Sequence, residues 1–266
     1  MITPQPTEGL ARRFDHTPQR PEGFRPHPGD QGLLRRDLGL LGATEGRLRA
    51  EHLRASGPGP ARPAVLAEGG ALRFLQVLQG RLGWRDAAGS AVELAPGDCA
   101  HLPPGQVARE VLASADAEWV EVAAVDPAVA AVGDANGLVI DRERAEAYRV
   151  GDGPRRFLAY RDPGVTAATG RRVNINIVRN SVAGDASTGW HYHTLSCQFV
   201  FVLRGWSRVA VDGHGETLLR AGDAMTIPYG LRHDVTGFSA DFTVLELNLP
   251  ADYQTIACEA PARPVH

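Results

Sequence analysis

The chain has 266 residues, of which 43% are hydrophobic and 22% charged, a composition typical of a globular protein with one large or two modest domains. Its net charge of −3 at pH 7 provides no basic surface, so nucleic acid and anionic membranes are not expected as partners. It has no run of about 18 apolar residues and no signal-peptide pattern. Together with three cysteines that lack C-x-x-C spacing, this favours a soluble, cytoplasmic protein with reduced thiols.

Residues 1–30 are rich in proline and polar residues, and we expect an extended arm there. The segment after it consists mainly of short apolar runs bounded by Gly, Pro and Asp, which is typical of an all-β protein. The main helical candidate is Asp141–Ala147, within an expected linker over 126–149. The predicted strands include Phe74–Leu78, Trp119–Val125, Val173–Val178, Phe199–Leu203, Arg208–Val211 and Phe242–Leu249.

The chain resembles itself at an offset of 125 residues, without a gap over most of the copy. We therefore predict two similar barrels over 31–125 and 150–250, followed by a tail over 251–266. The recurring residues include the glycines and prolines of the expected turns: Arg36-Asp37 and Arg161-Asp162, Ala43-Thr44 and Ala168-Thr169, Phe74 and Phe199, Gly80 and Gly205, Gly97-Asp98 and Gly222-Asp223, Pro103 and Pro228, and Glu121 and Glu246.

The second copy holds a pattern typical of a metal site. His191 and His193 are one residue apart, so on a strand both project to the same face. Gln198 lies in the next predicted strand, and His233 follows the turn Pro228-Tyr229-Gly230. Three neutral imidazoles and an amide oxygen suit one divalent ion such as Fe, Ni, Zn or Mn, with coordination positions left for water or substrate.

The first copy lacks these ligands. The residues 125 positions earlier are Leu66, Glu68, Arg73 and Ala108, and a leucine or an arginine cannot replace an imidazole ligand. We expect no metal of this type in the first barrel, where Glu68 and Arg73 could pair across strands.

These residues resemble the two signature motifs of the cupin superfamily, G-x5-H-x-H-x3-4-E-x6-G and G-x5-P-x-G-x2-H-x3-N. The match differs in having six residues between Gly184 and His191, Gln198 in place of the usual glutamate, and Gly237 in place of the terminal asparagine. The resemblance implies a bicupin, with two tandem double-stranded β-helix jelly rolls of the RmlC-like type. It also implies that the metal lies in the C-terminal barrel and that no organic cofactor is needed.

The candidates for substrate binding are less distinctive. Asn174 and Asn176 share one face of a predicted strand and replace Arg49 and Glu51 of the first copy. We also consider Tyr160, Met225 and Tyr229 for the mouth of the barrel, although packing is the commoner role of such side chains. We identify no obvious catalytic acid or base near the motif beyond the ligands, which favours chemistry done by the metal or no chemistry at all.

Two classes of function remain open. The first is a metal-dependent enzyme acting on a small oxygenated or carboxylated metabolite, by dioxygenase chemistry or by Lewis-acid isomerase, decarboxylase or lyase chemistry. Because Gln198 is neutral, the site keeps one more positive charge than a three-His, one-Glu site, which favours an anionic substrate. The second class is a non-catalytic sensor or storage protein for a metal or small molecule. We expect a monomer or a homodimer.

Overall fold

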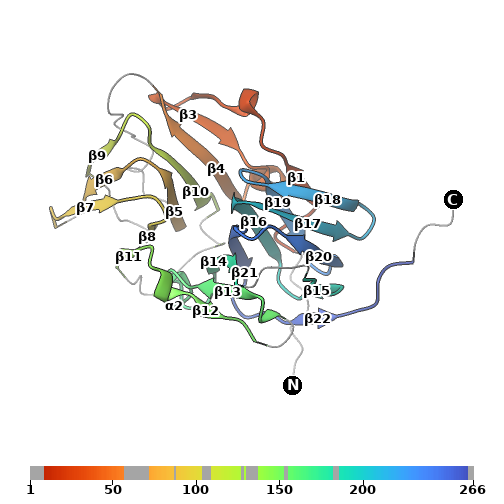
Figure 1. Cartoon of the computed structure of the whole chain (residues 1–266). Coiled ribbons are helices and arrows are strands. Elements are labelled where there is room, and N and C mark those ends of the chain that lie inside the picture. Colours follow the sequence, from red (N-terminus) through yellow and green to blue (C-terminus); the bar gives the residue numbers. More distant parts are fainter. Residues whose placement is uncertain are drawn as a thin grey trace. The chain divides into compact units, whose positions relative to one another are not determined.

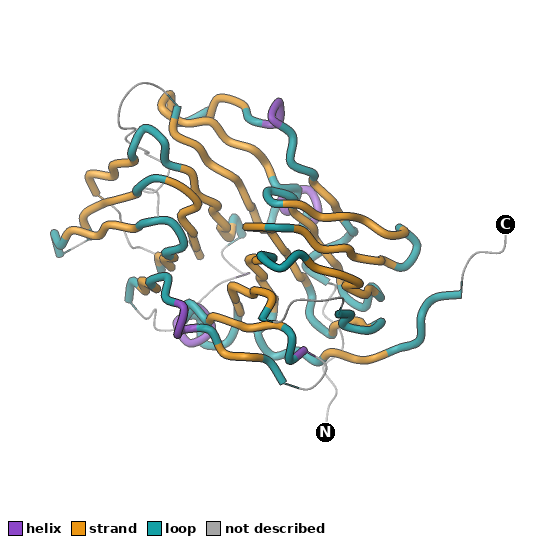
Figure 2. The backbone as a smooth tube through the Cα atoms, viewed as in Figure 1, coloured by secondary structure: helices purple, strands orange, loops and turns teal. Residues whose placement is uncertain are grey.

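The computed structural model describes residues 9–56, 72–86, 88–103, 109–126, 129, 137–152, 155–181 and 186–262. The chain forms two compact units. The N-terminal unit consists of Arg20–Ala147 and Pro163–Arg171, and the C-terminal unit of Met1–Gln19, Tyr148–Asp162 and Arg172–His266. Among the described residues, strands are the main regular structure of both units, and the helices are short (Figure 2). The predicted all-β class is confirmed.

The N-terminal unit contains a seven-stranded and a three-stranded sheet, and every described pairing is antiparallel. The large sheet has the order β11-β8-β5-β10-β4-β3-β2, and the small one the order β7-β6-β9 (Figure 1). The strands are β2 (Arg25–His27), β3 (Asp30–Asp37), β4 (Leu48–Ala55), β5 (Leu72–Gln79), β6 (Leu82–Arg85), β7 (Ala91–Leu94), β8 (Cys99–Leu102), β9 (Arg109–Ala113), β10 (Glu118–Ala124) and β11 (Val139–Asp141). The helices are η1 (Pro21–Gly23), α1 (Leu40–Ala43), η4 (Ala145–Ala147) and α2 (Val165–Ala168).

The C-terminal unit has a seven-stranded sheet with the order β1-β19-β16-β21-β14-β13-β12 and a five-stranded sheet with the order β18-β17-β20-β15-β22. All its described pairings are also antiparallel. Its strands are β1 (Asp15–Thr17), β12 (Arg149–Val150), β13 (Leu158–Arg161), β14 (Asn174–Asn180), β15 (His191–His193), β16 (Cys197–Arg204), β17 (Trp206–Val211), β18 (Gly215–Arg220), β19 (Ala224–Pro228), β20 (His233–Phe238), β21 (Thr243–Leu249) and β22 (Thr255–Ala257).

Each unit has its own hydrophobic core, and the two cores differ in side-chain size. Trp84 and Trp119 are buried in the N-terminal core. The residues 125 positions later, Val209 and Val244, occupy the C-terminal core. Because valine is much smaller than tryptophan, the C-terminal interior is less completely filled by its own side chains.

Segments expected to be an arm and a linker contribute edge strands. Within the C-terminal unit, β1 pairs with β19, and the backbone N–H of Gln19 donates to Asp223 Oδ1 at 2.6 Å. Within the N-terminal unit, β11 pairs with β8, and the N–H of Glu143 donates to Asp98 Oδ1 at 2.9 Å. The predicted arm therefore supplies a strand to the large sheet of the C-terminal unit, and the predicted linker supplies one to the large sheet of the N-terminal unit.

The prediction of a helix over Asp141–Ala147 is wrong. Asp141 ends β11, and only the 3-10 turn η4 is helical. Asp98 explains the difference, because Oδ2 accepts a hydrogen bond from Arg142 Nη1 at 2.7 Å in addition to the bond from Glu143. These contacts tie the segment after β11 to Asp98 and override its helical propensity.

Cys99, Cys197 and Cys258 form no disulfide. Among the described residues, no helix has the length and apolar character needed to cross a membrane.

Candidate metal centre

Three histidines converge in the C-terminal unit. His191 and His193 lie on β15, and His233 on β20 is the direct cross-strand partner of His191. One ring nitrogen from each lies within 4.8 Å of the others, and all three side chains are buried. Three nitrogens that each lie about 2.1 Å from one ion are at most about 4.2 Å apart, so a small inward movement of the rings would let all three bind one ion. Alternation along β15 and antiparallel pairing with β20 thus bring the predicted triad together.

The outer nitrogen of each ring is already hydrogen-bonded. Nδ1 of His191 lies 2.7 Å from the carbonyl oxygen of Gly189, and Nδ1 of His233 lies 2.9 Å from that of Leu231. Nδ1 of His193 lies 3.0 Å from Thr255 Oγ1. Since a carbonyl can only accept, Nδ1 carries the proton in His191 and His233, and Nε2 keeps a free lone pair. Such outer contacts orient metal-binding imidazoles in known sites.

The loop before His191 is fixed by Asp234, the residue after His233. Asp234 Oδ1 accepts hydrogen bonds from Ser187 Oγ at 2.8 Å and Thr188 Oγ1 at 3.2 Å. The side chain that follows one histidine thereby holds the loop whose carbonyl at Gly189 orients another. This network couples β15 to β20 beyond their short backbone pairing.

All three imidazoles favour the neutral form. Burial lowers the pKa of His191, with Arg155 adding to the effect. Burial and the neighbouring His233 and His191 lower the pKa of His193 to about 2. The pKa of His233 is lowered to about 4 by burial and by His191. A metal ion requires deprotonated imidazole, so no proton has to be displaced from these side chains at neutral pH.

Gln198 on β16 is the fourth predicted ligand. It is 5% exposed, and its Oε1 atom has no hydrogen-bond partner among the described residues. It lines the same cavity as the three histidines. A buried amide oxygen without a partner costs free energy, and coordination to an ion would remove that cost. The residues present therefore fit a divalent metal bound by three imidazoles and one amide oxygen.

The cavity beside the histidines has a volume of about 90 Å³ open to the centres of water molecules. At roughly 10–15 Å³ for each water centre, it accommodates several waters or a ligand of a few heavy atoms. Its wall is largely aliphatic and includes Val178, Val200, Val202, Val209, Val235 and Val244. The valines that replace tryptophan in the C-terminal core are thus residues of the cavity wall.

Charged and phenolic groups also line this cavity, which corrects the expectation that no acid or base stands near the ligands. They are Arg155, Tyr160 and Glu246. Arg155 Nη2 lies 3.4 Å from Thr255 Oγ1, and the guanidinium also hydrogen-bonds Tyr160. Burial, reinforced by Glu246, raises the pKa of Tyr160 to about 12, so its hydroxyl keeps its proton.

The structure separates the predicted substrate-binding residues into two groups. Tyr160 and Met225 line the cavity. Asn174 and Asn176 are not among the lining residues, and Asn176 Nδ2 donates to Asn174 Oδ1 at 2.8 Å. Tyr229 is 46% exposed and likewise is not a lining residue.

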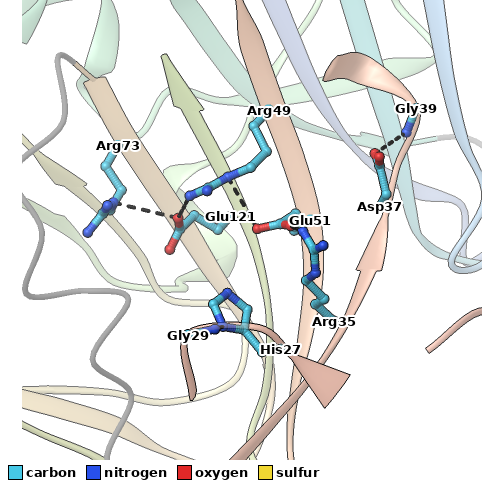
Figure 3. A network of polar contacts seen from close by, with 9 residues as sticks. All are labelled: His27, Gly29, Arg35, Asp37, Gly39, Arg49, Glu51, Arg73 and Glu121. Carbon is cyan, nitrogen blue, oxygen red and sulfur yellow. Dashed lines mark hydrogen bonds and ion pairs between the residues drawn. The ribbon is translucent and has the colours of Figure 1, made fainter. Parts of the chain in front are cut away.

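The N-terminal unit places ion pairs at the corresponding strand positions (Figure 3). Arg73, at the position 125 residues before Gln198, lies with Nε 3.6 Å from Glu121 Oε1. Arg49 joins the two acids, with Nη2 3.1 Å from Glu121 Oε1 and Nε 3.2 Å from Glu51 Oε2. Arg35 Nη1 completes the network at 2.7 Å from Glu51 Oε1. Of the other positions compared with ligands, Leu66, Glu68 and Ala108 lie outside the described residues.

Sequence reasoning missed four residues around the histidines: Arg155, Glu246, Tyr253 and Thr255. Tyr253 packs edge-on against His193, with ring centroids 5.3 Å apart. Tyr253 and Thr255 lie in the predicted tail, where β22 pairs with β15, and no local pattern marked them. Glu246 did carry a signal, because it recurs as Glu121 while the arginines beside Glu121 do not recur.

Comparisons with known proteins agree with this architecture. Residues 180–245 match the model of the Cupin domain family, whereas no curated protein matches the chain. Protein YlbA from E. coli, of family-model DUF861, is 16% identical with a TM-score of 0.65, and the match covers 92% of this chain and 95% of that one.

Two further solved structures are similar. A putative glyoxylate induced protein from Pseudomonas aeruginosa is 13% identical with a TM-score of 0.68, covering 99% of this chain and 97% of that one. Oxalate decarboxylase from Bacillus subtilis, described with Mn(II) centres, is 15% identical with a TM-score of 0.54, covering 85% and 74%. At these identities the likeness establishes the fold. The chain is therefore a cupin-fold protein, with a cupin domain over residues 180–245.

Proposed function

We propose that this chain is a metal-dependent enzyme that acts on a small carboxylated metabolite by Lewis-acid chemistry of the isomerase, decarboxylase or lyase kind. The observation that carries the proposal is one cavity that contains three neutral histidines, an unsatisfied amide oxygen at Gln198 and the guanidinium of Arg155. A divalent ion bound by His191, His193, His233 and Gln198 would polarise a substrate oxygen.

Arg155 is the expected binding residue for the carboxylate. Among the described residues, no carboxylate lies within ion-pair distance of it, and its contacts are the neutral hydroxyls of Thr255 and Tyr160. A guanidinium presents paired N–H donors that match a carboxylate. Tyr160, which stays protonated, orients that guanidinium, and the valines of the wall exclude water from the bound ligand.

The charges in the cavity also support an anionic substrate. The four ligands are neutral, so they leave the charge of a divalent ion uncompensated, and Arg155 adds another positive charge. Glu246 is the single carboxylate among the lining residues. The charged groups beside the proposed metal site favour proton-transfer and Lewis-acid chemistry over dioxygen chemistry, which does not need them.

The first experiment is elemental analysis of full-length protein purified without added metal or affinity tag. We expect close to one Fe, Ni, Zn or Mn per chain in the wild type and none in His191→Ala/His233→Ala. Metal-loaded and chelated protein are then incubated with a panel of small carboxylates, and turnover is followed by NMR. Equal metal in the double variant would refute the site, and a metal-loaded protein that turns over no carboxylate would favour the sensor or storage function.

A further inference from the structure

Glu246 has an acidic counterpart in the first half of the chain, Glu121, but the two carboxylates have different neighbours. Glu121 on β10 and Glu246 on β21 are 125 residues apart. Glu121 is 1% exposed and contacts two cations, Arg49 Nη2 at 3.1 Å and Arg73 Nε at 3.6 Å. Figure 3 shows it between these two side chains. In the N-terminal unit this carboxylate therefore belongs to a structural ion-pair network.

Both cations are absent around Glu246. The residues 125 positions after Arg49 and Arg73 are Asn174 and Gln198, which are neutral amides. Within the described part of the chain Glu246 forms no ion pair, and its hydrogen bond comes from Asn248 Nδ2 to Oε1 at 2.6 Å. Glu246 lines the cavity that holds the three histidines. The same acid is thus neutralised in one unit and left facing a cavity in the other.

Glu246 is half-buried, so its carboxylate loses part of its hydration, and one side-chain hydrogen bond offsets that loss without a cation among the described residues to pair with it. Its ionised form therefore adds little to stability. Groups that cost stability and face a cavity are characteristic of functional sites. Asn248 fixes Oε1, so the second oxygen is the one available to a ligand.

We propose that Glu246 is the proton acceptor of the cavity, for a small carboxylate that carries a hydroxyl or amino group beside its carboxylate. This inference rests on the proposed function, in which Arg155 binds the carboxylate. Glu246 accepts the O–H or N–H hydrogen bond of the ligand and then takes that proton. The electron pair of the broken bond stays on the substrate, and the protonated Glu246 returns the proton to the product. The step needs no oxidant or reductant.

The first test needs neither metal nor ligand. Thermal unfolding is compared for Glu121→Gln and Glu246→Gln, the same substitution at matched positions. Glu121→Gln leaves Arg49 and Arg73 without their carboxylate and should lower the Tm by roughly 5–10 °C. Glu246→Gln keeps the acceptor for Asn248 and removes an uncompensated charge, so the Tm should stay unchanged or rise. A loss in Glu246→Gln as large as in Glu121→Gln would show a structural role and overturn the proposal.

The second test uses zinc-loaded protein and two probes that differ by one hydroxyl, lactate and propionate, with binding measured by calorimetry. Glu246→Gln should weaken lactate binding about tenfold or more, because a hydrogen bond to a charged acceptor is lost. It should leave propionate binding equal or tighter, because a repelling charge is removed. If both probes bind more tightly by the same factor, Glu246 acts only as a charge and the proposal fails.

The zinc content distinguishes a failure of the role proposed for Glu246 from a failure of the proposed metal-dependent function. Zinc in neither the wild type nor Glu246→Gln would refute the metal site, and the comparison of unfolding temperatures would still decide the role of Glu246. Zinc in the wild type but not in Glu246→Gln would make Glu246 a metal ligand and overturn its role as proton acceptor.

Discussion

Acidification should destabilise the metal-free protein through the histidine cluster. In an unfolded chain a histidine has a pKa near 6.5, whereas the folded protein lowers the pKa of His193 to about 2 and that of His233 to about 4. At pH 5 the unfolded state therefore binds a proton at both residues, and the folded state at neither. Because the unfolded state binds more protons, stability that is present at pH 7.5 is lost as the pH falls below about 6.5.

The size of the effect follows from the distance between pH 5 and the unfolded pKa. A difference of about 1.5 pH units at about 1.4 kcal/mol per unit corresponds to about 2 kcal/mol for each histidine, or about 4 kcal/mol for the pair. His193→Gln/His233→Gln should lose this part of the pH dependence. His52 and His101, whose pKa values are also lowered by burial, contribute to both proteins and cancel in the comparison.

The measurement is urea unfolding of chelated wild type and double variant at pH 7.5 and pH 5. The wild type should lose about 4 kcal/mol more of its unfolding free energy than the variant does. Equal losses in the two proteins would refute the reasoning, because the acid sensitivity would then arise outside the cluster.

Four other changes test separate features. Chelation should lower the Tm of the wild type but not of His191→Ala, measured by scanning calorimetry, since a ligand stabilises only the state that binds it. Thr255→Val removes the hydroxyl at Nδ1 of His193 and should weaken zinc affinity about 10- to 100-fold in a competition titration. Val244→Trp places the residue found at Trp119 in the cavity wall and should abolish lactate binding while zinc content is retained. Gly205→Ala should lower the free energy of unfolding in urea by more than about 2 kcal/mol, because the added Cβ would clash with Ser239 Oγ and lie 3.0 Å from Phe242 Cα. Gly213→Ala is the control: its φ of 75° is similar but its Cβ would meet open space, so it isolates the backbone contribution.

The histidines were accessible to sequence reasoning because their geometry is local. Alternation along a strand places His191 and His193 on one face whatever the rest of the fold does. His233 required the family motif, since its cross-strand pairing with His191 depends on the register of β15 and β20. The turns around them were equally accessible, because Gly205 and Gly222 have the positive φ values, 68° and 89°, that glycine adopts readily.

The other lining residues depend on contacts that no local pattern encodes. Arg155 precedes His191 by 36 residues. Glu246 follows His233 by 13 residues and lies on β21, in a different sheet from the histidines, so only the assembled unit brings these side chains to one cavity. Asn174 and Asn176 show the converse. The sequence placed them on one face of a strand, and their side chains do hydrogen-bond each other. They are not among the residues that line the cavity. The 3-10 turn at Ala145–Ala147 likewise reflects the distant Asp98, which propensity cannot anticipate.

Two edge strands, β1 and β11, lie outside the barrel ranges predicted from the sequence, and they determine where this chain can be divided. A fragment that starts at residue 150 would lack β1, and the backbone groups of β19 that pair with Asp15–Thr17 would face solvent. A fragment that stops at residue 125 would similarly expose β8, which pairs with Val139–Asp141. Exposed edges of this kind recruit strands from other chains. Gene fusion, circular permutation or expression of separate halves would therefore have to carry each edge strand with the sheet it completes, not with its neighbours in sequence.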